Sequence, residues 1–492
     1  MSYKALKSGT DVRGIASDLG GKEVNLTDEA VYDITSAFAT FVAAKYGKKT
    51  GELKIAVGHD SRISAFRISM QVISALKNLG VSVLNCNLAS TPAMFMTTVD
   101  LGTDGAVQIT ASHHPFDRNG LKFFIKEGGL ESSQLGEIIE IADKGEFDTV
   151  EGGSVENIDY MSTYSAGLRK KICEAIGKAE ADKPLSGYHI VVDAGNGVGG
   201  FYAYNVLEPL GADISGSRYL EPDGMFPNHI PNPEDKTAMQ SICDAVKESG
   251  ADLGVIFDTD VDRAGCVDCY GNEINRNRLI ALAAIIAANG RKNCTIVTDS
   301  VTSDGLKEFI EKDLECKHYR YRRGYKNVID KAVELCEQGI DCPLAIETSG
   351  HAALKENYFL DDGAYLITKI IIELGRGRDL NKTLENLKMP KEERECRLNI
   401  TEESFKDYGL RVINELEAFV LQDKNTYKVA DDNREGIRVS TPYGWFLLRL
   451  SVHDPVMPLN FESDELGGVD KMLSLVRPFF EKYSGLDISA IK

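Results

Sequence analysis

The chain has 492 residues, which is too many for a single hydrophobic core, so several domains are expected. Its composition is that of an ordinary globular protein, with 43% hydrophobic and 27% charged residues. The formal net charge of -19 argues against nucleic acid or an anionic membrane as a bulk partner. A small anionic ligand stays compatible with this charge, because a local basic pocket can outweigh the overall field.

The ten cysteines are scattered and mostly lie in apolar patterns, which suits reduced thiols better than a disulfide framework. Cys266 and Cys269 have C-x-x-C spacing, but no second pair follows at the distance of a zinc site. The N-terminus has no apolar signal core, and the longest apolar run, 279–288, is far shorter than the roughly 20 residues of a membrane span. We therefore expect a soluble, cytoplasmic protein without a membrane partner. The sequence does not indicate an oligomeric state.

One structural unit recurs along the chain: a short β-branched run, a polar or glycine-rich loop, and a helical pattern. It begins at 54–62, at 189–200 and at 294–303, and each copy leads to a further strand pattern. This alternation predicts three similar α/β domains with mixed, mainly parallel sheets. After residue 395, strand patterns alternate with turns instead, which indicates a smaller α+β domain with an antiparallel sheet.

The predicted domains are I (1–155), II (156–272), III (273–385) and IV (386–492). Residues 151–164 resemble a linker between the first unit and a helix that enters the second, and residues 268–279 resemble a hairpin turn that closes the second domain. In this arrangement one polar residue follows a strand in each α/β domain: Ser112, Asp258 and Glu347. Open α/β sheets bind their ligands at these strand ends, so the pattern indicates a composite site.

The stretch "ADLGVIFDTDVDRAG" carries Asp258, Asp260 and Asp262 after a buried strand pattern. Three carboxylates so close repel one another unless a cation neutralises them, and oxygen ligands suit Mg²⁺. An EF-hand is excluded, because Arg263 stands where that loop needs glycine. Arg263 would be available to an anionic ligand on the metal. The alternative is a solvated acidic turn.

The stretch "TASHHPFDRNGLKFF" places Ser112 at a strand end. It lacks the G-x-S-x-G pattern of a hydrolase, and His113 and His114 lack the spacing of a helical zinc pair. A serine that carries a phosphoryl group, with Lys122 to neutralise it, is the remaining functional interpretation. A capping serine beside structural histidines is the alternative.

Two further loops suit a sugar phosphate. In "LAIETSGHAAL", Glu347 and Ser349 would suit sugar hydroxyls, although a polar turn explains them equally well. In "GWFLLRLSVHDP", Arg449, Ser451 and His453 point the same way at a predicted strand end, as a phosphate cradle or as an exposed strand end.

Two other stretches have weaker interpretations. In "HYRYRRGYK", Arg320 and Arg322 share a strand face that would take a phosphate, unless this is a solvated edge strand. "VDAGNGVGG" (192–200) is not an ATP-binding P-loop, and we expect a turn that permits tight strand–helix packing.

In this order and spacing the motifs resemble those of the α-D-phosphohexomutase family, the phosphoglucomutases and phosphomannomutases, from "GTDVRG" (9–14) to "LNFES" (459–463). The resemblance implies three α/β domains and a C-terminal α+β domain around a central cleft. It implies phosphorylation of Ser112, Mg²⁺ held by that phosphate and three aspartates, sugar recognition, and binding of the non-reacting phosphate. The implied residues are Ser112, Asp258, Asp260 and Asp262 for the metal; Glu347 and Ser349 for the sugar; Arg449 and Ser451 for the phosphate; Arg13, Lys122 and His351 near the reacting oxygens; and Lys326 for the substrate.

The implied reaction interconverts hexose 1-phosphate and hexose 6-phosphate, with glucose or mannose as the sugar. Ser112 would exchange phosphoryl groups through a hexose 1,6-bisphosphate, which would also act as activator, and the last domain would close to exclude water. His351, Lys122 and His113 are candidates for the general base, and the sequence does not rank them.

The chain departs from the family pattern at several positions. His114 stands where asparagine is usual, and Thr259 and Val261 replace glycines, which should stiffen the metal loop. Val452 and His453 leave fewer neutral donors in the phosphate loop, and a protonated His453 would compensate.

Three alternatives stay open. A phosphotransferase of the haloacid dehalogenase type would use Asp258 as nucleophile, because "DTDV" resembles its motif. A degenerate mutase would bind sugar phosphates without catalysis. A phosphoglucosamine-type mutase would act on an amino sugar.

Overall fold

The computed structural model describes residues 2–147, 149–451 and 454–491. The chain forms two compact units. Unit 1 contains the chain up to Asn275 with Ser349–Ala352 and Leu360–Asn381; unit 2 contains Arg276–Thr348, Ala353–Phe359 and the chain from Lys382 onward. No helix in the described part of the chain is long and apolar enough to cross a membrane.

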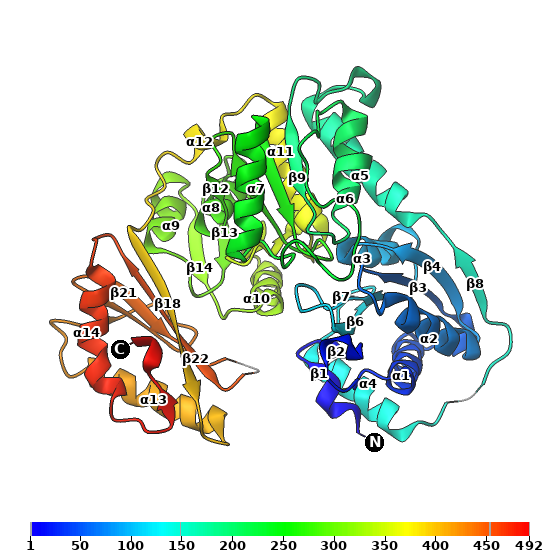
Figure 1. The fold of residues 1–492 in the computed structure, drawn as a ribbon, viewed down its shortest axis with the longest axis horizontal. Helices are drawn as coiled ribbons and strands as arrows, with labels where there is room; N and C mark the ends of the chain where they lie inside the picture. Colours follow the sequence, from blue (N-terminus) through cyan, green and yellow to red (C-terminus); the bar gives the residue numbers. More distant parts are fainter. Residues whose placement is uncertain (1, 148, 452–453, 492) are drawn as a thin grey trace. The chain divides into compact units, whose positions relative to one another are not determined.

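Unit 1 begins with an eight-stranded mixed sheet, drawn in blue and cyan in Figure 1. Its strand order is β1-β2-β6-β5-β3-β4-β8, with β7 paired to β6, and β5, β3, β4 and β8 run parallel. The elements are β1 (Lys7–Ser8), β2 (Asp11–Ile15), α1 (Asp28–Tyr46), β3 (Lys54–His59), α2 (Ala65–Asn78), β4 (Ser82–Leu88), α3 (Thr91–Asp100), β5 (Gly105–Ile109), β6 (Arg118–Ile125), β7 (Gly128–Gly129), α4 (Ser132–Lys144) and β8 (Ser154–Asn157).

The local signals of these elements are simple. Thr27 caps α1 by accepting a hydrogen bond from the Ala30 N–H, and Gly47 ends the helix in the left-handed conformation. Every residue of β5 is buried, including the polar Gln108, whose side-chain amide donates to the Ala89 carbonyl at 2.8 Å.

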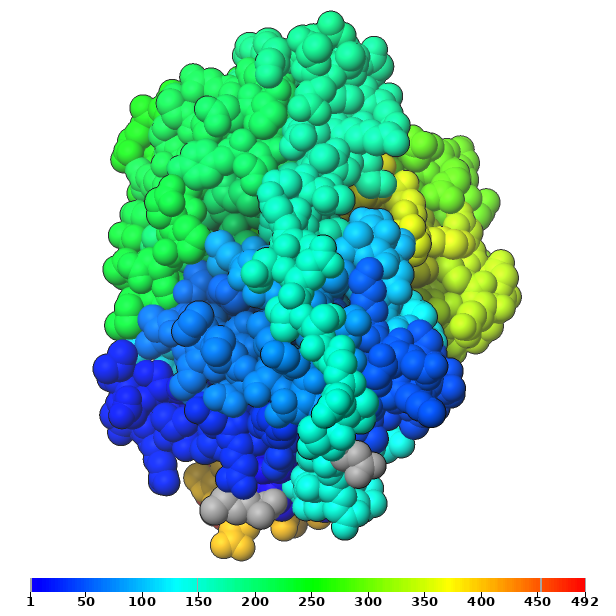
Figure 2. All heavy atoms as spheres, turned by 90° about the vertical axis from the view of Figure 1, so that its right-hand side faces the viewer, coloured from blue at the N-terminus to red at the C-terminus, as the bar shows by residue number. Residues whose placement is uncertain are grey.

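The predicted linker at 151–164 is wrong in part. Residues 154–157 form β8, which pairs in parallel with β4 at the edge of the first sheet. All four residues of β8 are exposed, so the strand has no hydrophobic alternation from which to predict it. Figure 2 shows this cyan segment crossing the blue surface of the first domain.

The second sheet of unit 1 has the order β12-β11-β10-β9, in which β9 and β10 are parallel and the other pairs antiparallel. The β11–β12 pair confirms the hairpin predicted around residues 268–279. The elements are α5 (Tyr160–Ile176), β9 (Ile190–Asp193), α6 (Gly200–Tyr202), α7 (Lys236–Ser249), β10 (Leu253–Phe257), β11 (Ala264–Asp268), β12 (Glu273–Ile274) and α11 (Gly363–Gly375).

The glycine-rich turn after β9 permits tight packing of the start of α6 on a strand, as predicted, because a Cβ atom on Gly199 would lie 3.0 Å from a ring carbon of Phe257 in β10. The same turn also packs closely on the loop after β10. A Cβ atom on Gly197 would lie 2.5 Å from the carbonyl oxygen of Thr259, so only glycine fits there. The Val198 N–H donates to the same oxygen at 2.8 Å. This turn therefore supports the loop that carries the three aspartates.

Unit 2 contains strands of a third sheet, in which β13 lies between β14 and β15 and runs parallel to both. Its elements are α8 (Asn277–Ala288), β13 (Thr295–Thr298), α9 (Asp304–Glu308), β14 (Lys317–Arg320), α10 (Tyr325–Glu337) and β15 (Leu344–Ile346). The chain continues through β16 (Ala352–Leu354), β17 (Leu360–Asp361) and α12 (Leu380–Thr383) at the boundaries of the units.

The C-terminal sheet of unit 2 is antiparallel throughout, with the order β19-β20-β21-β22-β18-β23. Its elements are β18 (Glu392–Ile400), α13 (Phe405–Val420), β19 (Lys428–Val429), β20 (Ile437–Thr441), β21 (Gly444–Leu448), β22 (Val456–Ser463), α14 (Gly468–Phe480) and β23 (Leu486–Asp487). Three α/β sheets and one antiparallel sheet confirm the predicted fold class.

Candidate active site

The loop after β10 forms a buried acidic cluster. β10 is buried along its whole length, and Asp258, Asp260 and Asp262 follow it at alternate positions. All three side chains are buried, and one carboxylate oxygen of each lies within 4.8 Å of the others. The alternative of a solvated acidic turn is therefore excluded. Three neighbouring carboxylates that are shielded from water require a cation or protons to neutralise their charge.

The three carboxyl groups differ in protonation. Burial and the neighbouring Asp262 and Asp260 raise the pKa of Asp258 well above its usual value. Burial and Asp262 raise the pKa of Asp260 to about 6. For Asp262, burial alone would raise the pKa, but Lys122 and His351 outweigh it and hold that pKa below its usual value. Without a cation, Asp258 and Asp260 therefore keep their protons to a higher pH than Asp262 does.

The donor set of this cluster fits a divalent cation. Oδ1 of Asp260 and Oδ1 of Asp262 are buried and accept no hydrogen bond within the described part of the chain. The second oxygen of each is held: Thr91 Oγ1 donates to Asp260, and Lys122 Nζ donates to Asp262 Oδ2 at 3.0 Å. Buried carboxylate oxygens without partners cost free energy that a hard cation such as Mg²⁺ would recover.

Ser112 lies against this cluster. Its Oγ donates to Asp258 Oδ2 at 3.1 Å and lies 3.3 Å from His113 Nδ1. Ser112 is buried and has a φ of 49°, in the left-handed region that residues other than glycine rarely adopt. The structure thus brings together the loops after β5 and β10, as predicted from the strand ends.

Lys122, Arg263 and His351 surround the acidic cluster. Besides the Lys122–Asp262 ion pair, Arg263 Nε donates to His351 Nε2 at 3.1 Å and lies 3.8 Å from Asp258 Oδ2. His351 Nε2 lies 3.6 Å from Asp262 Oδ1. Two cationic side chains and an imidazole therefore face three carboxylates in a buried site.

Ser349 and Arg13 lie close to this group. Ser349 Oγ is 2.8 Å from His351 Nδ1. Arg13 is on β2, which pairs with β6, the strand that carries Lys122, and its guanidinium donates to Asp11 Oδ2 at 2.8 Å. The structure therefore places both predicted residues on segments that adjoin the cluster.

The two histidines after Ser112 are neutral at physiological pH. Burial, with the Arg263 charge next, lowers the pKa of His113 to about 2. Burial, with Arg13 next, lowers the pKa of His114 to about 3. Their rings stack with centroids 5.1 Å apart.

Glu347 and Lys326 lie in unit 2. Glu347 follows β15 and is buried, and its Oε1 accepts a hydrogen bond from the Gly324 N–H at 2.6 Å. Lys326, in the first turn of α10, forms an ion pair with Asp330. The unit boundary passes between Thr348 and Ser349, so Glu347 and Ser349 belong to different units.

Two residues of the predicted phosphate cradle, Arg449 and Ser451, directly follow β21, which ends at Leu448. Backbone pairing with β22 continues there, because the Arg449 N–H donates to the Pro458 carbonyl at 3.1 Å and the Ser451 N–H to the Val456 carbonyl at 3.0 Å. Ser451 Oγ accepts a hydrogen bond from the Asp454 N–H at 3.2 Å, and the nearest carboxylate to Arg449 is Glu395, at 4.0 Å. His453 and Val452 lie outside the described residues.

Sequence reasoning missed a second arginine beside Arg449. Burial lowers the pKa of Arg449, and the charge of Arg323 lowers it further, so the two guanidinium groups act on each other. Arg323 Nε also lies 3.8 Å from Asp299 Oδ2. Arg323 belongs to the stretch "HYRYRRGYK", in which the strand alternation singles out Arg320 and Arg322 instead.

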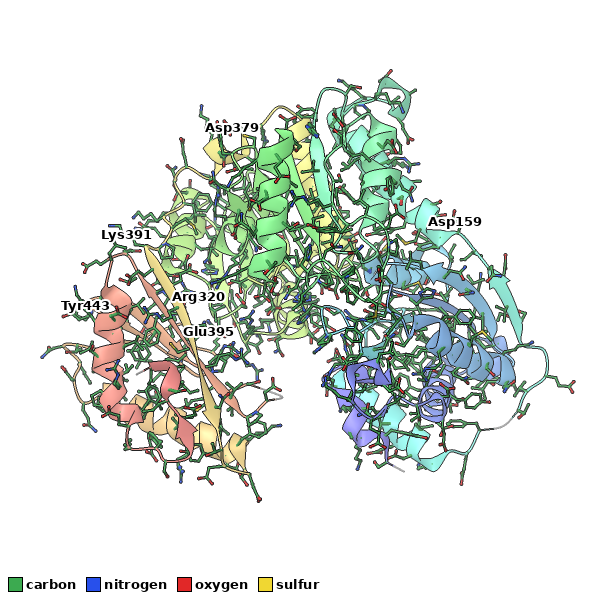
Figure 3. The ribbon with its side chains drawn as sticks, viewed as in Figure 1. Asp159, Arg320, Asp379, Lys391, Glu395 and Tyr443 are labelled. Atoms are coloured by element: carbon green, nitrogen blue, oxygen red, sulfur yellow. The ribbon has the colours of Figure 1, made fainter. Side chains whose placement is uncertain are left out.

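The interpretation of Arg320 as a phosphate ligand is wrong. Its side chain is buried and forms ion pairs with Asp304 at 2.8 Å and Asp432 at 3.1 Å, and Arg322 lies beyond the end of β14. Arg320, labelled in Figure 3, thus links the third sheet to the loop between β19 and β20 within unit 2. Because its guanidinium already pairs with two carboxylates, Arg320 has a structural role.

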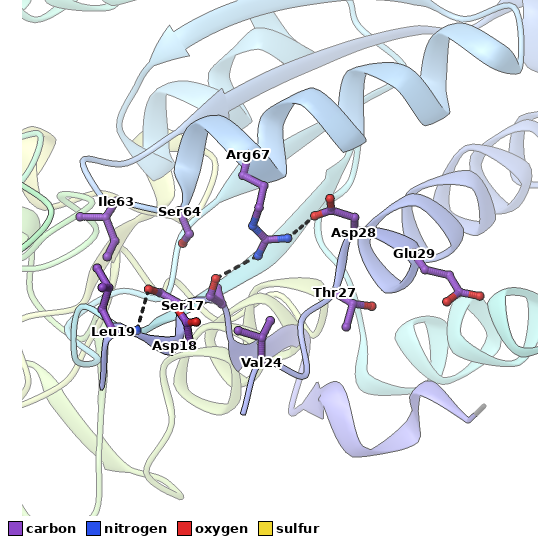
Figure 4. Close-up of a pocket in the computed structure, with 11 residues that line it drawn as sticks. Ser17, Asp18, Leu19, Val24, Thr27, Asp28, Glu29, Ile63, Ser64 and Arg67 are labelled. Carbon is purple, nitrogen blue, oxygen red and sulfur yellow. Dashed lines mark hydrogen bonds and ion pairs between the residues drawn. The ribbon is translucent and has the colours of Figure 1, made fainter. Parts of the chain in front are cut away.

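A surface hollow of about 760 Å³ in unit 1 lies apart from these residues (Figure 4). Its walls come from the loop before α1 and the start of α2, and they include Leu19, Ile63 and Arg67. None of the predicted site residues lines it.

A buried serine beside an acidic cluster, with cationic side chains around both, is the arrangement of an enzyme that transfers phosphoryl groups. Three domain families match the chain: phosphoglucomutase/phosphomannomutase alpha/beta/alpha domain I at residues 6–149, domain II at 163–271 and domain III at 275–389. The chain belongs to the phosphoglucomutase/phosphomannomutase family.

Individual relatives cover nearly the whole chain. It is 30% identical to a phosphoglucomutase of Neisseria gonorrhoeae over 96% of this chain and 95% of that protein. It is 30% identical to a phosphomannomutase/phosphoglucomutase of Pseudomonas aeruginosa over 95% of this chain and 93% of that protein. A crystal structure of a family protein from Burkholderia thailandensis superposes with a TM-score of 0.80 at 25% identity, covering 98% of both chains. The chain is accordingly an enzyme of the intramolecular phosphotransferase class.

Proposed function

We propose that this enzyme interconverts the 1-phosphate and 6-phosphate of glucose and of mannose, through phosphoserine at Ser112 and a hexose 1,6-bisphosphate. The observation that carries the proposal is the 3.1 Å contact between Ser112 Oγ and Asp258 in the buried acidic cluster. It places the hydroxyl that would carry the phosphoryl group against the residues that would hold Mg²⁺. The bisphosphate would also act as activator, by restoring phosphoserine after accidental hydrolysis.

The residues that would hold Mg²⁺ are Asp258, Asp260 and Asp262, together with the phosphate on Ser112. When bound, the cation supplies charge neutralisation for the phosphoryl oxygens. Because the pKa values of Asp258 and Asp260 are raised in its absence, the cation competes with protons for these carboxylates, and its affinity should fall as the pH is lowered.

The side chains around Ser112 would position and neutralise the phosphoryl group. Lys122 and Arg263 carry positive charge at the cluster, and phosphoryl transfer depends mainly on such positioning and electrostatic stabilisation. Arg13, on the neighbouring β2, would add a third cation. The phosphoryl group would pass from Ser112 to the free hydroxyl of the hexose monophosphate, and the other phosphoryl group of the resulting bisphosphate would return to Ser112.

A base must take the proton of the attacking hydroxyl. His113 is the weakest of the three candidates, because a group whose pKa is about 2 holds a proton poorly. Lys122 donates to Asp262 and is engaged as a cation. We therefore favour His351, whose Nε2 faces Asp262 and accepts from Arg263.

Substrate binding would involve Glu347, Ser349 and Lys326 on the sugar side, and Arg449 and Ser451 on the non-reacting phosphate. Glu347 and Ser349 would contact hydroxyls away from C2, where glucose and mannose differ, so the site would accept both sugars. Burial and the charge of Arg323 lower the pKa of Arg449, while Glu435, Glu395 and Asp299 act in the opposite direction. The presence of two interacting arginines in this part of unit 2 supports a role in binding the non-reacting phosphate.

The experiment is peptide mass mapping after incubation with glucose 1,6-bisphosphate and Mg²⁺, using wild type and Ser112→Ala. Phosphate on the Ser112 peptide, discharged by added hexose monophosphate, is the expected result. Acid-labile phosphate in Ser112→Ala would instead indicate Asp258 as the nucleophile. Binding of the bisphosphate without transfer would indicate a binding protein. Parallel assays with the 1-phosphates of glucose, mannose and glucosamine identify the sugar.

A further inference from the structure

Arg62 lies beneath the loop that carries Ser112. The residue follows β3, and its side chain is completely buried. Its guanidinium donates to four carbonyl oxygens of this one loop: those of Pro115 at 2.7 Å, Arg118 at 2.9 Å, His114 at 2.6 Å, and Ser112 itself. These four carbonyls, which span seven residues of chain, therefore converge on a single side chain.

The remaining sides of the guanidinium are also fixed. Arg62 Nε donates to Asp60 Oδ2 at 3.2 Å, and the backbone N–H of Arg62 donates to Oδ1 of the same carboxylate at 2.9 Å. The ring of Phe226 lies with its centroid 5.2 Å from the guanidinium carbon. All five N–H donors of Arg62 thus have acceptors, and an aromatic ring covers one face.

We infer that Arg62 is a positioning residue for phosphoryl transfer: it fixes the loop in the conformation that directs Ser112 Oγ at Asp258. The left-handed φ of Ser112 is unfavourable for a serine, so surrounding contacts must hold it, and the carbonyl of Ser112 is one of the four that Arg62 binds. The catalytic consequence rests on the proposed function. The loop-fixing role does not, because it depends only on contacts within unit 1.

The structural reason for arginine at this position is its planar fork. A lysine would bring one ammonium with three donors and could not reach acceptors that surround a plane. Arg62→Lys would keep the positive charge beside Asp60 but would leave buried carbonyls of the loop without donors. The substitution therefore separates the geometry of Arg62 from its charge.

Arg67→Lys is the matched control. Arg67 lies on α2 and also donates to two backbone carbonyls, those of Ala16 at 3.0 Å and Leu26 at 3.1 Å, and pairs with Asp28 (Figure 4). Its contacts hold the loop before α1 and none reaches Ser112. The same change of side chain thus tests a second arginine of unit 1 that binds backbone carbonyls, although its side chain is 35% exposed and that of Arg62 is buried.

Two measurements test the inference on the full chain. The first is amide hydrogen exchange of the peptide 110–119, which measures how well ordered the backbone of the loop is. We expect Arg62→Lys to raise exchange in that peptide and to leave the peptides of β10 and α2 unchanged, whereas Arg67→Lys leaves 110–119 unchanged. The second is steady-state kinetics with phosphorylation of Ser112 by glucose 1,6-bisphosphate. We expect kcat and the phosphorylation rate to fall about 100-fold with KM little changed, since a displacement of about 1 Å costs that much.

The outcomes are distinct. If Arg62→Lys exchanges as the wild type does in 110–119 and is phosphorylated at the same rate, the inference is overturned. If the wild type is never phosphorylated, the proposed function fails while hydrogen exchange still decides the role of Arg62. Should Arg62→Lys not fold, Phe226→Leu serves instead: it keeps every hydrogen bond of Arg62 but uncovers the guanidinium, so a smaller rise in exchange confined to 110–119 supports the inference, and no change opposes it.

Discussion

Replacing Asp260 by asparagine should stabilise the metal-free enzyme while abolishing its affinity for Mg²⁺. The pKa of Asp260 rises from 3.8 to about 6 in the folded protein, chiefly through burial and through Asp262. The folded state therefore holds this proton more tightly than the unfolded state does. Its stabilising effect is complete below pH 4, declines as the pH rises through 6, and is lost at higher pH. A shift of about 2 units corresponds to about 3 kcal/mol.

Asparagine cannot ionise, so the variant avoids this loss, and its amide oxygen still accepts the hydrogen bond from Thr91. In EDTA at pH 7.5 we expect unit 1 of Asp260→Asn to unfold at a temperature about 5 °C above the wild type, from about 3 kcal/mol. At pH 4.5 the gain should shrink to about 1 kcal/mol, because the wild-type Asp260 is then protonated. With Mg²⁺ the order should reverse, since only the wild type gains from the cation.

The assay is scanning calorimetry in EDTA and in Mg²⁺ at both pH values. The single tryptophan, Trp445, lies in unit 2, so its fluorescence checks that the transition of that unit is unchanged. Asp262→Asn is the control of opposite sign: it leaves buried Lys122 without the carboxylate it binds at 3.0 Å and should destabilise the protein. If the unfolding temperature of Asp260→Asn in EDTA exceeds that of the wild type by the same amount at both pH values, or does not exceed it at all, the electrostatic reasoning is refuted.

Three further predictions concern other parts of the molecule. Lys122→Met should lower kcat at least 100-fold, because one preorganised donor at a developing charge contributes about 3 kcal/mol; steady-state kinetics measures this, and an unchanged kcat would contradict the role. Arg449→Ala should raise KM for hexose phosphates about 10- to 100-fold, as expected for a lost charged hydrogen bond of about 1.5–3 kcal/mol, with a smaller effect on kcat; an unaltered KM would count against the phosphate site. Arg320→Met should destabilise unit 2 by about 1.5–3 kcal/mol, because Asp304 and Asp432 each lose a charged hydrogen bond while Arg438 and Lys307 remain paired with them, and the Trp445 fluorescence transition reports it. The folded fraction of Arg320→Met should have the kcat of the wild type. A loss of kcat without a loss of stability would indicate that Arg320 belongs to the active site.

Much of the fold and part of the site could be predicted from the sequence alone. The strand–loop–helix units are local patterns, and β5 and β10 are continuous buried runs, so the strand ends at which Ser112 and Asp258 emerge were predictable. The three aspartates occupy five consecutive positions, so their proximity needs no tertiary information. The change to antiparallel pairing after residue 395 was also visible in the pattern of strands and turns.

The tertiary structure alone decided which distant groups meet. Ser112 Oγ and Asp258 are 146 residues apart in the sequence, and Arg62 is 50 residues from the Ser112 carbonyl that it binds. Val261 replaces a family glycine, and only the structure shows that it is buried with a φ of 68°, a conformation that a β-branched residue tolerates at a cost of about 1–3 kcal/mol.

The errors have the same origin. Residues 154–157 carry no apolar alternation, and they form β8 only because β4 offers an unpaired edge. Arg320 has the sequence surroundings of a ligand-binding residue, yet its carboxylate partner Asp432 is 112 residues away. Periodicity and spacing describe forces within a few residues, so they fix the elements and the nearby ligands. The partners of a buried charge depend on how sheets pack, and that is settled by the burial of surfaces far apart in the chain.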